Sequence, residues 1–404
     1  MSVGSKSMAA LTDVSETVAV EKLVAGGEAL AHLADGRVVF VEGALPGETV
    51  VVRIHTSKRD FARGVAVSIV QPSPSRVDAP CPRLEAGCGG CSWQHGQPEA
   101  QLQWKTEIVT EALQRIAKLP NPDVRAGAAV EPWHYRTTLR LAVAADGTVG
   151  LRATGSHRVV SIDDCLVAHP ALVELLPGLL VRGADEISLR VSVATGEITA
   201  FSETPGAKAF GLPESVRVGA NATLHEVVAG VRLRVSAASF FQSGPHAAEL
   251  LVSHVREACG TMLMPGGGQL LDAYGGVGLF AAALAVPAEM TAIVVEMSES
   301  ACRDAAINLG AAAQVVCTQL DDWLPQHVRL VIADPSRAGL GRDDAAVLAA
   351  TNAERIVVVS CDAASLARDA GLLASLGYKH HGSTVLDVFP HTPHVEVVTR
   401  FDHR

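Results

Sequence analysis

Three cysteines lie close together in the stretch CPRLEAGCGGCSWQH. Cys81, Cys88 and Cys91 follow the spacing C-x6-C-x2-C, and the next cysteine in the chain is Cys165. Clustered thiolates in a large intracellular chain bind metals more often than they form disulfides. A zinc ribbon would need a second C-x2-C pair, which is missing, whereas three clustered cysteines and a distant fourth are typical of an iron–sulfur cluster. The spacing favours such a cluster, with zinc and buried structural thiols as alternatives.

Another cysteine follows an apolar run in RIVVVSCDAASLARD. The pattern predicts a strand that ends at Ser360 and Cys361, directly before a helix. This places the Cys361 thiol at the carboxyl edge of a sheet, where ligands bind in α/β folds, and near a helix N-terminus that favours a thiolate. Cys361 is therefore a candidate reactive group, and a buried strand-end cysteine is the alternative.

A glycine-rich turn precedes this cysteine in the chain. The stretch GGQLLDAYGGVGLFAAALA reads as a strand with Asp272 at its end, a turn containing Gly275, Gly276 and Gly278, and a helix. Such a turn lets a ligand approach the backbone and the helix N-terminus. The next strand, TAIVVE, ends in Glu296, where a carboxylate can accept two ribose hydroxyls.

A third strand, RLVIAD, ends in Asp334. Three strands that each end in a carboxylate, the first followed by a glycine turn, predict S-adenosylmethionine binding on a doubly wound sheet.

The elements that must position these residues fall into three predicted domains. Residues 14–71 alternate short β-rich runs with Gly, Pro and Asp turns, which predicts a small β-barrel of the oligonucleotide-binding type. Residues 77–235 form a central β-rich α+β domain that contains the cysteine cluster. Residues 236–404 alternate strands and helices and predict an α/β doubly wound, Rossmann-like domain. In the barrel, Lys58, Arg59 and Arg63 surround Phe61, a set that could contact RNA or be a solvated face.

Charge and composition limit the function further. The chain has 404 residues and a net charge of −10, and residues 236–404 carry 10 basic against 18 acidic side chains. A nucleic acid would therefore have to be bound by the first two domains. The start MSVGSKSMAALTDVSET lacks a basic segment followed by an apolar run, and no apolar run reaches the roughly 18 residues of a membrane span. We expect a cytoplasmic protein without membrane contact.

The motifs together resemble a known family. From about Val18 to Phe401 the chain is similar to the S-adenosylmethionine-dependent RNA uracil-5-methyltransferases of the TRAM-domain, iron–sulfur type. The resemblance is carried by FVEGALPGE, CPRLEAGCGGCSWQH with the later DDC, FFQSG, LDAYGGVGLF, ADPSRAGLG, VVSCDAASLARD and DVFPHTPHVEVV, in this order.

The resemblance implies roles for individual residues. Cys361 would be the nucleophile that adds to carbon 6 of uracil, and Glu396 the general base that removes the proton from carbon 5. A [4Fe-4S] cluster would be held by Cys81, Cys88, Cys91 and Cys165. Contacts to the methyl donor would come from Gln242, Asp272, Tyr274, Gly275, Gly276, Gly278, Glu296, Gln319 and Asp334.

Some positions depart from the family pattern. The third strand ends in DPSR where the family more often has DPPR, and the nucleophile is followed by Asp362 and Ala363 where it more often has Asn and Pro. Gly275 and Leu279 stand where cysteine and asparagine are more common. The histidines His391 and His394 are interpreted as surface or packing residues, with no metal assigned.

The expected product is 5-methyluridine in RNA. We expect the enzyme to be a monomer. The TRAM-like barrel favours 23S ribosomal RNA as the substrate, by analogy with the family. A transfer-RNA uracil-5-methyltransferase and a non-catalytic RNA-binding relative remain as alternatives.

Overall fold

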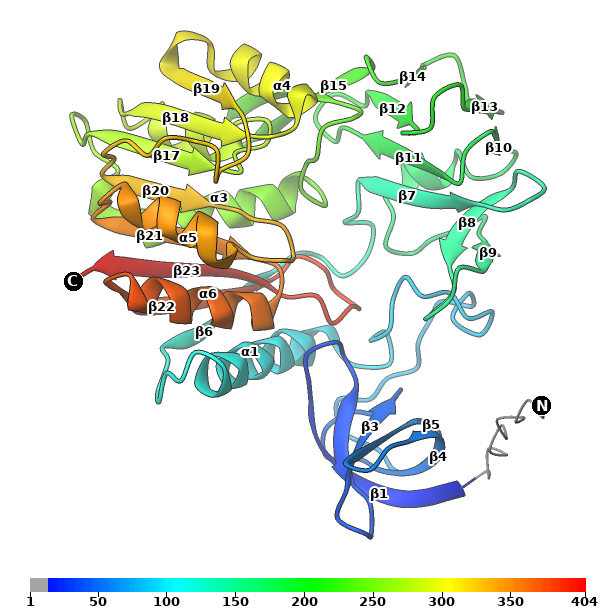
Figure 1. The fold of residues 1–404 in the computed structure, drawn as a ribbon. Coiled ribbons are helices and arrows are strands. Elements are labelled where there is room, and N and C mark those ends of the chain that lie inside the picture. Colours follow the sequence, from blue (N-terminus) through cyan, green and yellow to red (C-terminus); the bar gives the residue numbers. More distant parts are fainter. Residues whose placement is uncertain (1–13) are drawn as a thin grey trace, which may run out of the picture.

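The structure is a computed structural model that describes residues 14–404. A small barrel at the amino-terminal end lies below a β-rich central region and a large α/β sheet (Figure 1). Most of the amino-terminal stretch used above to argue for a cytoplasmic protein lies outside the described residues. Within residues 14–404, no helix combines the length and the hydrophobicity needed to cross a bilayer.

The first five strands form a closed barrel, as the turn pattern predicts. Neighbouring strands follow the order β1-β2-β3-β5-β4, and β4 pairs with β1 to close the barrel. Apolar side chains alternate inward along each strand, so that Val18 and Val20 of β1 and Val50 and Val52 of β4 are buried. The strands are β1 (Val14–Leu23), β2 (Ala29–His32), β3 (Val38–Glu42), β4 (Thr49–Ser57) and β5 (Phe61–Gln71).

The central region is β-rich, also as predicted. Its main sheet has six strands in the order β14-β12-β11-β7-β8-β9, and two further pairs of strands, β10 with β13 and β15 with β16, flank it. One short helix, α2 (Pro170–Val173), packs against the main sheet. The strands are β7 (Thr138–Val143), β8 (Val149–Arg152), β9 (Val159–Ser161), β10 (Leu180–Arg182), β11 (Glu186–Val191), β12 (Ile198–Phe201), β13 (Lys208–Phe210), β14 (Val216–Val218), β15 (Thr223–Val228) and β16 (Val231–Ser236).

The carboxyl-terminal sheet has eight strands in the order β19-β18-β17-β20-β21-β23-β22-β6. The five strands from β19 to β21 run parallel, and β23 is antiparallel to both of its neighbours. The strands are β6 (Val124–Ala129), β17 (Gln269–Ala273), β18 (Thr291–Glu296), β19 (Ala313–Cys317), β20 (Leu330–Ala333), β21 (Arg355–Ser360), β22 (Tyr378–Asp387) and β23 (Glu396–His403). The doubly wound fold with a closing hairpin is thus confirmed, while the edge strand β19 was not predicted.

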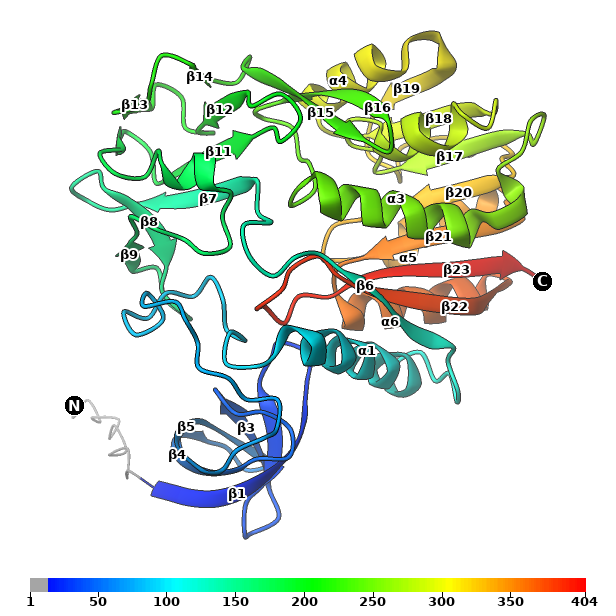
Figure 2. The same ribbon diagram turned by 180° about the vertical axis from the view of Figure 1, so that it is seen from behind.

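Helices cover both faces of this sheet. One core cluster joins the sheet to α1 (Pro98–Arg115), α5 (Gly341–Ala350) and α6 (Ala363–Ser375). A second cluster joins the other face to α3 (Pro245–Cys259), to α4 (Glu299–Leu309) and to the π-helical segment Ala281–Ala285. Figure 2 shows α3 lying across that face. Short 3-10 turns, Gly260–Met262 and Gly310–Ala312, follow α3 and α4.

The helix α1 and the strand β6 do not pack with the central region to which the sequence analysis assigns them. β6 extends the carboxyl-terminal sheet by pairing with β22, and α1 packs against α6 and β22. The reason is that α1 buries its apolar side chains Ile108, Val109 and Leu113 in the core of that sheet. Local sequence patterns do not reveal which of two neighbouring cores receives such a face.

Candidate active site

A cavity of about 390 Å³ opens at the carboxyl edge of the parallel strands. In the strand order β19-β18-β17-β20-β21, the chain leaves β17 toward β18 on one side and leaves β20 toward β21 on the other, so a crevice forms between the carboxyl ends of β17 and β20. The residues that line the cavity come from the ends of four parallel strands, from the start of antiparallel β23, and from two loops. They are Phe240, Gln242, Tyr274, Gly276, Glu296, Ser298, Ala301, Asp334, Pro335, Ser336, Arg337, Cys361, Phe389, His394 and Glu396.

Cys361 and Glu396 reach the cavity from adjacent strands. Cys361 follows the last residue of β21, and Glu396 is the first residue of β23, which pairs with β21 through Ser360 and Val397. Because β23 is antiparallel to β21, its start lies at the same edge as the end of β21. The Glu396 side chain is almost completely buried, with 4% of its surface exposed. The thiol and the carboxylate, 35 positions apart in sequence, thus face one space.

The acidic groups of the site have raised pKa values. Burial raises the pKa of Asp334 to about 7, and a hydrogen bond donated by Gln242 Nε2 to Asp334 Oδ2 (3.1 Å) opposes the rise. Burial and the nearby Asp334 raise the pKa of Glu396 well above its ordinary value. Two carboxyl groups that share a poorly solvated site resist simultaneous ionisation. A cation in the cavity would lower the pKa values of both carboxyl groups, because it favours their charged forms.

The Cys361 thiol also has a raised pKa in this site. Burial, followed by the charges of Glu396 and Asp334, raises its pKa to about 11, and Arg337 opposes the rise. The helix N-terminus that follows is already capped, because Asp362 accepts a hydrogen bond from Ser365 N (2.7 Å) through its own carboxylate. In the donor-free site, burial and the neighbouring carboxyl groups therefore favour the neutral thiol, although a helix N-terminus follows Cys361.

The glycine turn and Glu296 form a rigid rim of the cavity. Glu296 accepts hydrogen bonds from Gly276 N (3.0 Å) and Ser298 N (2.6 Å), which orients its carboxylate. Tyr274 has a positive φ of 59°, and its hydroxyl donates to Asp344. This turn leaves the backbone at Gly276 open toward the cavity, since a Cβ there would meet nothing within 4 Å.

Several of the residues expected to contact the methyl donor lie outside the main cavity. Asp272 is fully buried and supports the turn by accepting from Ala281 N (2.9 Å), while burial raises its pKa to about 8. Gly275 lines a smaller adjoining cavity. Gly278 packs under the turn, where a Cβ would lie 2.8 Å from Leu309. Gln319 is exposed and lines neither cavity.

The structure adds side chains that sequence reasoning did not select. Phe240 is 71% exposed at the mouth of the cavity, and Phe389 and His394 lie edge to face with ring centroids 6.0 Å apart. Arg337 lies 3.5 Å from His394 Nε2. The motifs FFQSG, DPSR and FPHTPH contain these residues, but only the fold shows which of their side chains reach the cavity.

The four expected cluster cysteines lie around one space. Cys81, Cys88, Cys91 and Cys165 all line a second, small cavity that shares no residue with the first, and none of them is in a disulfide. Burial raises the pKa of Cys88 and Cys165, and raises that of Cys91 to about 11. In the described part of the chain, however, no group of three His, Cys, Asp or Glu side chains has an arrangement that could hold a metal ion.

The predicted RNA-binding residues of the barrel are partly engaged with one another. Arg63 forms an ion pair with Glu28 and lies over the rings of Phe40 and Phe61, 5.2 and 6.0 Å from their centroids. Arg59 is almost fully exposed. The barrel therefore presents a cluster of Arg63 with two aromatic rings and an exposed loop in which Arg59 lies 3.8 Å from Asp60.

Comparison with known proteins assigns the chain to a family. The TRAM domain family matches residues 15–67. An uncharacterized RNA methyltransferase of Streptomyces avermitilis is 36% identical, over 92% of this chain and 94% of its own. The 23S rRNA (uracil(1939)-C(5))-methyltransferase RlmD of Dichelobacter nodosus is 31% identical over 90% of this chain and 93% of its own.

A solved structure agrees with these matches. The tRNA (uracil-54, C5)-methyltransferase of Pyrococcus abyssi, in complex with S-adenosyl-L-homocysteine, superposes with a TM-score of 0.72 and 25% identity, covering 95% of this chain and 99% of its own. The chain therefore belongs to the RNA methyltransferases that carry a TRAM domain and that include the uracil-C5-methyltransferases.

Proposed function

We propose that this enzyme transfers a methyl group from S-adenosylmethionine to carbon 5 of a uracil in RNA, with Cys361 as nucleophile and Glu396 as base. The observation that carries the proposal is the convergence of this thiol and this buried carboxylate on one cavity, beside the glycine turn and Glu296. The 23S rRNA methyltransferase and the tRNA methyltransferase among its relatives support the reaction class.

The residue types suit this reaction. Carbon 5 of uracil is a poor nucleophile, and addition of the Cys361 thiolate to carbon 6 converts the ring into an enolate. The enolate attacks the methyl group, and the sulfonium becomes a neutral thioether. Glu396 then removes the proton from carbon 5, and expulsion of the thiolate restores the double bond between carbons 5 and 6.

The raised pKa values fit a cationic methyl donor. Asp334, Glu396 and Cys361 all titrate high because they share one poorly solvated space. A sulfonium placed among them would favour their charged forms, including the thiolate. Methyl transfer removes that positive charge, so the proton affinity of Glu396 rises at the step in which it must accept a proton.

Glu296, Tyr274 and Gln242 have positions that suit binding of the donor. Glu296 is fixed by two backbone hydrogen bonds and presents its carboxylate at the end of β18, where a ribose would lie. Gln242 holds Asp334 and lines the same cavity. Gly276 leaves the turn open toward the cavity, whereas Gly275 and Gly278 allow the turn to pack closely on Val294 and Leu309, and Asp272 supports it from below. We assign no donor contact to Gln319.

A base inside a structured RNA must leave its stack before it can reach the cavity. Aromatic side chains at the mouth, Phe240 and Phe389, offer surfaces for stacking. We propose 23S ribosomal RNA as the substrate because of the similarity to the 23S enzyme along most of the chain. Transfer RNA is the second candidate, favoured by the structural match.

We also propose that Cys81, Cys88, Cys91 and Cys165 hold a [4Fe-4S] cluster. The support is the chemistry of the set, since four soft sulfur donors line one cavity beside the guanidinium of Arg136, which would balance negative charge. Their present arrangement would not hold a single metal ion, so the proposal rests on the donor types and the shared cavity. When bound, such a cluster would cross-link the cysteine-rich segment to the central region. Iron and sulfide are measured in anaerobically purified protein. Cys88→Ser should lose both, whereas Cys259→Ala, the control at a buried cysteine elsewhere, should retain both. Equal iron in the two variants would refute the assignment.

The proposed reaction is tested with labelled S-adenosylmethionine and unmodified 23S and transfer RNA, followed by nucleoside analysis. Label should appear as 5-methyluridine in one RNA class with the wild type. It should be absent with Cys361→Ala, although this variant keeps its fold. Label in another nucleoside, or full activity of Cys361→Ala, would refute the proposal.

A further inference from the structure

The loop of residues 388–395 joins β22 to β23 and ends at Glu396. It also carries two residues of the active-site cavity, Phe389 and His394. Leu386, near the end of β22, pairs with Glu396 across the two strands. The conformation of this loop therefore fixes where the Glu396 carboxylate and the two rings lie.

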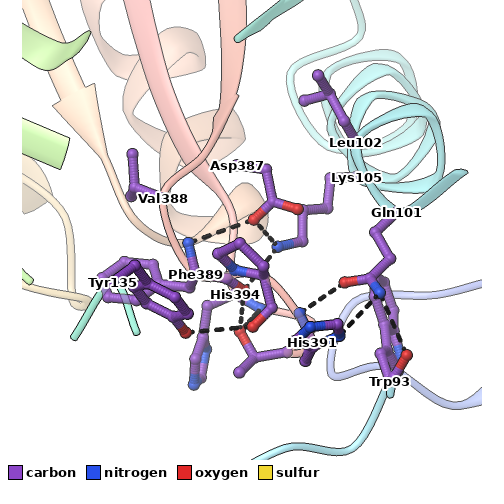
Figure 3. Close-up of polar contacts among 12 residues, drawn as sticks. Trp93, Gln101, Leu102, Lys105, Tyr135, Asp387, Val388, Phe389, His391 and His394 are labelled. Carbon is purple, nitrogen blue, oxygen red and sulfur yellow. Dashed lines mark hydrogen bonds and ion pairs between the residues drawn. The ribbon is translucent and has the colours of Figure 1, made fainter. Parts of the chain in front are cut away.

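Helix α1 holds this loop through two side chains that are both completely buried. Lys105 Nζ donates to Asp387 Oδ1 (2.6 Å), at the end of β22, and to Phe389 O (3.0 Å). Gln101, one helical turn earlier, accepts from His391 N (2.6 Å) through Oε1. Figure 3 shows both side chains pointing from α1 into the loop. Residues four apart share one face of a helix, so Gln101 and Lys105 together form hydrogen bonds with both ends of the segment 387–391 from one face of α1.

Other residues also form hydrogen bonds with the loop. Tyr135 Oη donates to Pro390 O (3.1 Å), and Trp93 N donates to His391 O (2.9 Å) (Figure 3). Each of these contacts is a single hydrogen bond to one carbonyl oxygen. Ser243 Oγ donates to Val388 O, Trp133 stacks on the His391 ring, and Arg337 lies beside the His394 ring. Lys105 differs from these groups because its charge bonds both Asp387, at the end of β22, and the backbone of the loop that leads to the base.

The energetics of this pair argue for a role beyond stability. Burial lowers the pKa of Lys105 and raises that of Asp387, because removal from water disfavours the charged form of each side chain. Replacing a buried ion pair by well-packed apolar side chains is often neutral for stability, so stability alone does not explain this pair, and a positional role is the hypothesis to test. Here the pair holds a loop leading into the active site.

We propose that Lys105, assisted by Gln101, is a positioning residue that holds the loop 388–395 so that Glu396 can reach the carbon 5 proton. The inference rests on the proposed roles of Cys361 and Glu396. Loss of Lys105 then leaves thiolate addition and methyl transfer in place, because Cys361 directly follows β21 and is not part of the loop, but it slows proton removal. The methylated RNA stays covalently bound to Cys361 until that proton leaves.

The test measures this covalent species directly. Full-length wild type, Glu396→Gln and Lys105→Met are mixed with S-adenosylmethionine and with unmodified 23S rRNA or tRNA, whichever the wild type methylates. Denaturing gels then follow the protein–RNA adduct with time. Lys105→Met should accumulate methylated adduct and release it at least tenfold more slowly than the wild type, with unchanged affinity for S-adenosylhomocysteine. Glu111→Gln, also on α1, removes a partly buried ion pair with Lys22 of β1 and makes no contact with the loop, so it should behave as the wild type.

The outcomes separate the two proposals. Absence of adduct with Glu396→Gln would overturn the assigned base. Adduct with Glu396→Gln together with wild-type release by Lys105→Met would overturn the positioning role alone. If Lys105→Met does not fold, Gln101→Met removes a loop hydrogen bond without leaving a buried charge, and it should also slow release. Normal release by folded Gln101→Met would then refute the inference.

Discussion

The affinity for S-adenosylmethionine should depend on pH near neutrality. Burial raises the pKa of Asp334 to about 7 in the donor-free enzyme, in spite of the hydrogen bond from Gln242. The carboxyl group is then largely protonated at pH 6 and largely ionised at pH 8. A cationic donor binds the ionised form better, so its binding releases a proton and strengthens as the pH rises.

The magnitude follows from the ionised fraction. With a pKa of about 7, this fraction is roughly one eleventh at pH 6 and ten elevenths at pH 8, a tenfold change that equals about 1.4 kcal/mol. Over this range S-adenosylmethionine should therefore bind about tenfold more tightly at the higher pH. S-adenosylhomocysteine lacks the sulfonium charge, and its affinity should change much less.

Titration calorimetry at pH 6, 7 and 8 measures both dissociation constants. The ratio of the two affinities should rise with pH in the wild type and become flat in Asp334→Asn. Glu396→Gln serves as the matched control, since it removes the other buried carboxyl group and should keep most of the slope. A ratio that is flat in the wild type, or equally steep in Asp334→Asn, would refute the reasoning.

Three further changes have expected outcomes. Cys361→Ala should abolish methyl transfer and the covalent RNA adduct, while the thermal unfolding midpoint stays within a few degrees of the wild type; a surviving adduct would show another nucleophile. Gly278→Ala combines a φ of 84° with a Cβ 2.8 Å from Leu309, so the free energy of unfolding should fall by about 2 kcal/mol. Gly371→Ala, in a helix with free space around it, should instead raise it by about 0.5–1 kcal/mol, and denaturant titration of both variants checks the contrast. Although burial raises it, hydrogen bonds from two arginines bring the pKa of Asp402 down from 3.8 to about 2, so Asp402→Asn should cost about 2 kcal/mol at pH 7. Most of that difference should be lost as the pH falls from 4 to 2, and a difference that is undiminished at pH 2 would contradict the assignment.

The sequence alone predicted most of the fold. Alternating short runs predicted the barrel, and apolar runs ending in Asp272, Glu296 and Asp334 predicted parallel strands that end at one edge. These patterns are local, because strand periodicity and glycine turns are properties of a few neighbouring residues. The assignment of α1 and β6 could not be obtained in this way, since an apolar helix face fits either of two adjacent cores.

The chemistry of the site was only half determined by residue type. The sequence identified a cysteine at a strand end and, through family resemblance, a glutamate in an apolar strand. Whether Cys361 is a thiolate depends on its burial and on Glu396 and Asp334 beside it, and those neighbours come from other strands.

Tertiary structure decided the remaining features. It selected Phe240, Arg337 and His394 as residues of the cavity and left Gln319 outside it. It also brought Lys105 to Asp387 across 282 positions of the chain. Strand and turn signals are written in short stretches of sequence, whereas burial and electrostatic fields arise between side chains that only the folded chain brings together.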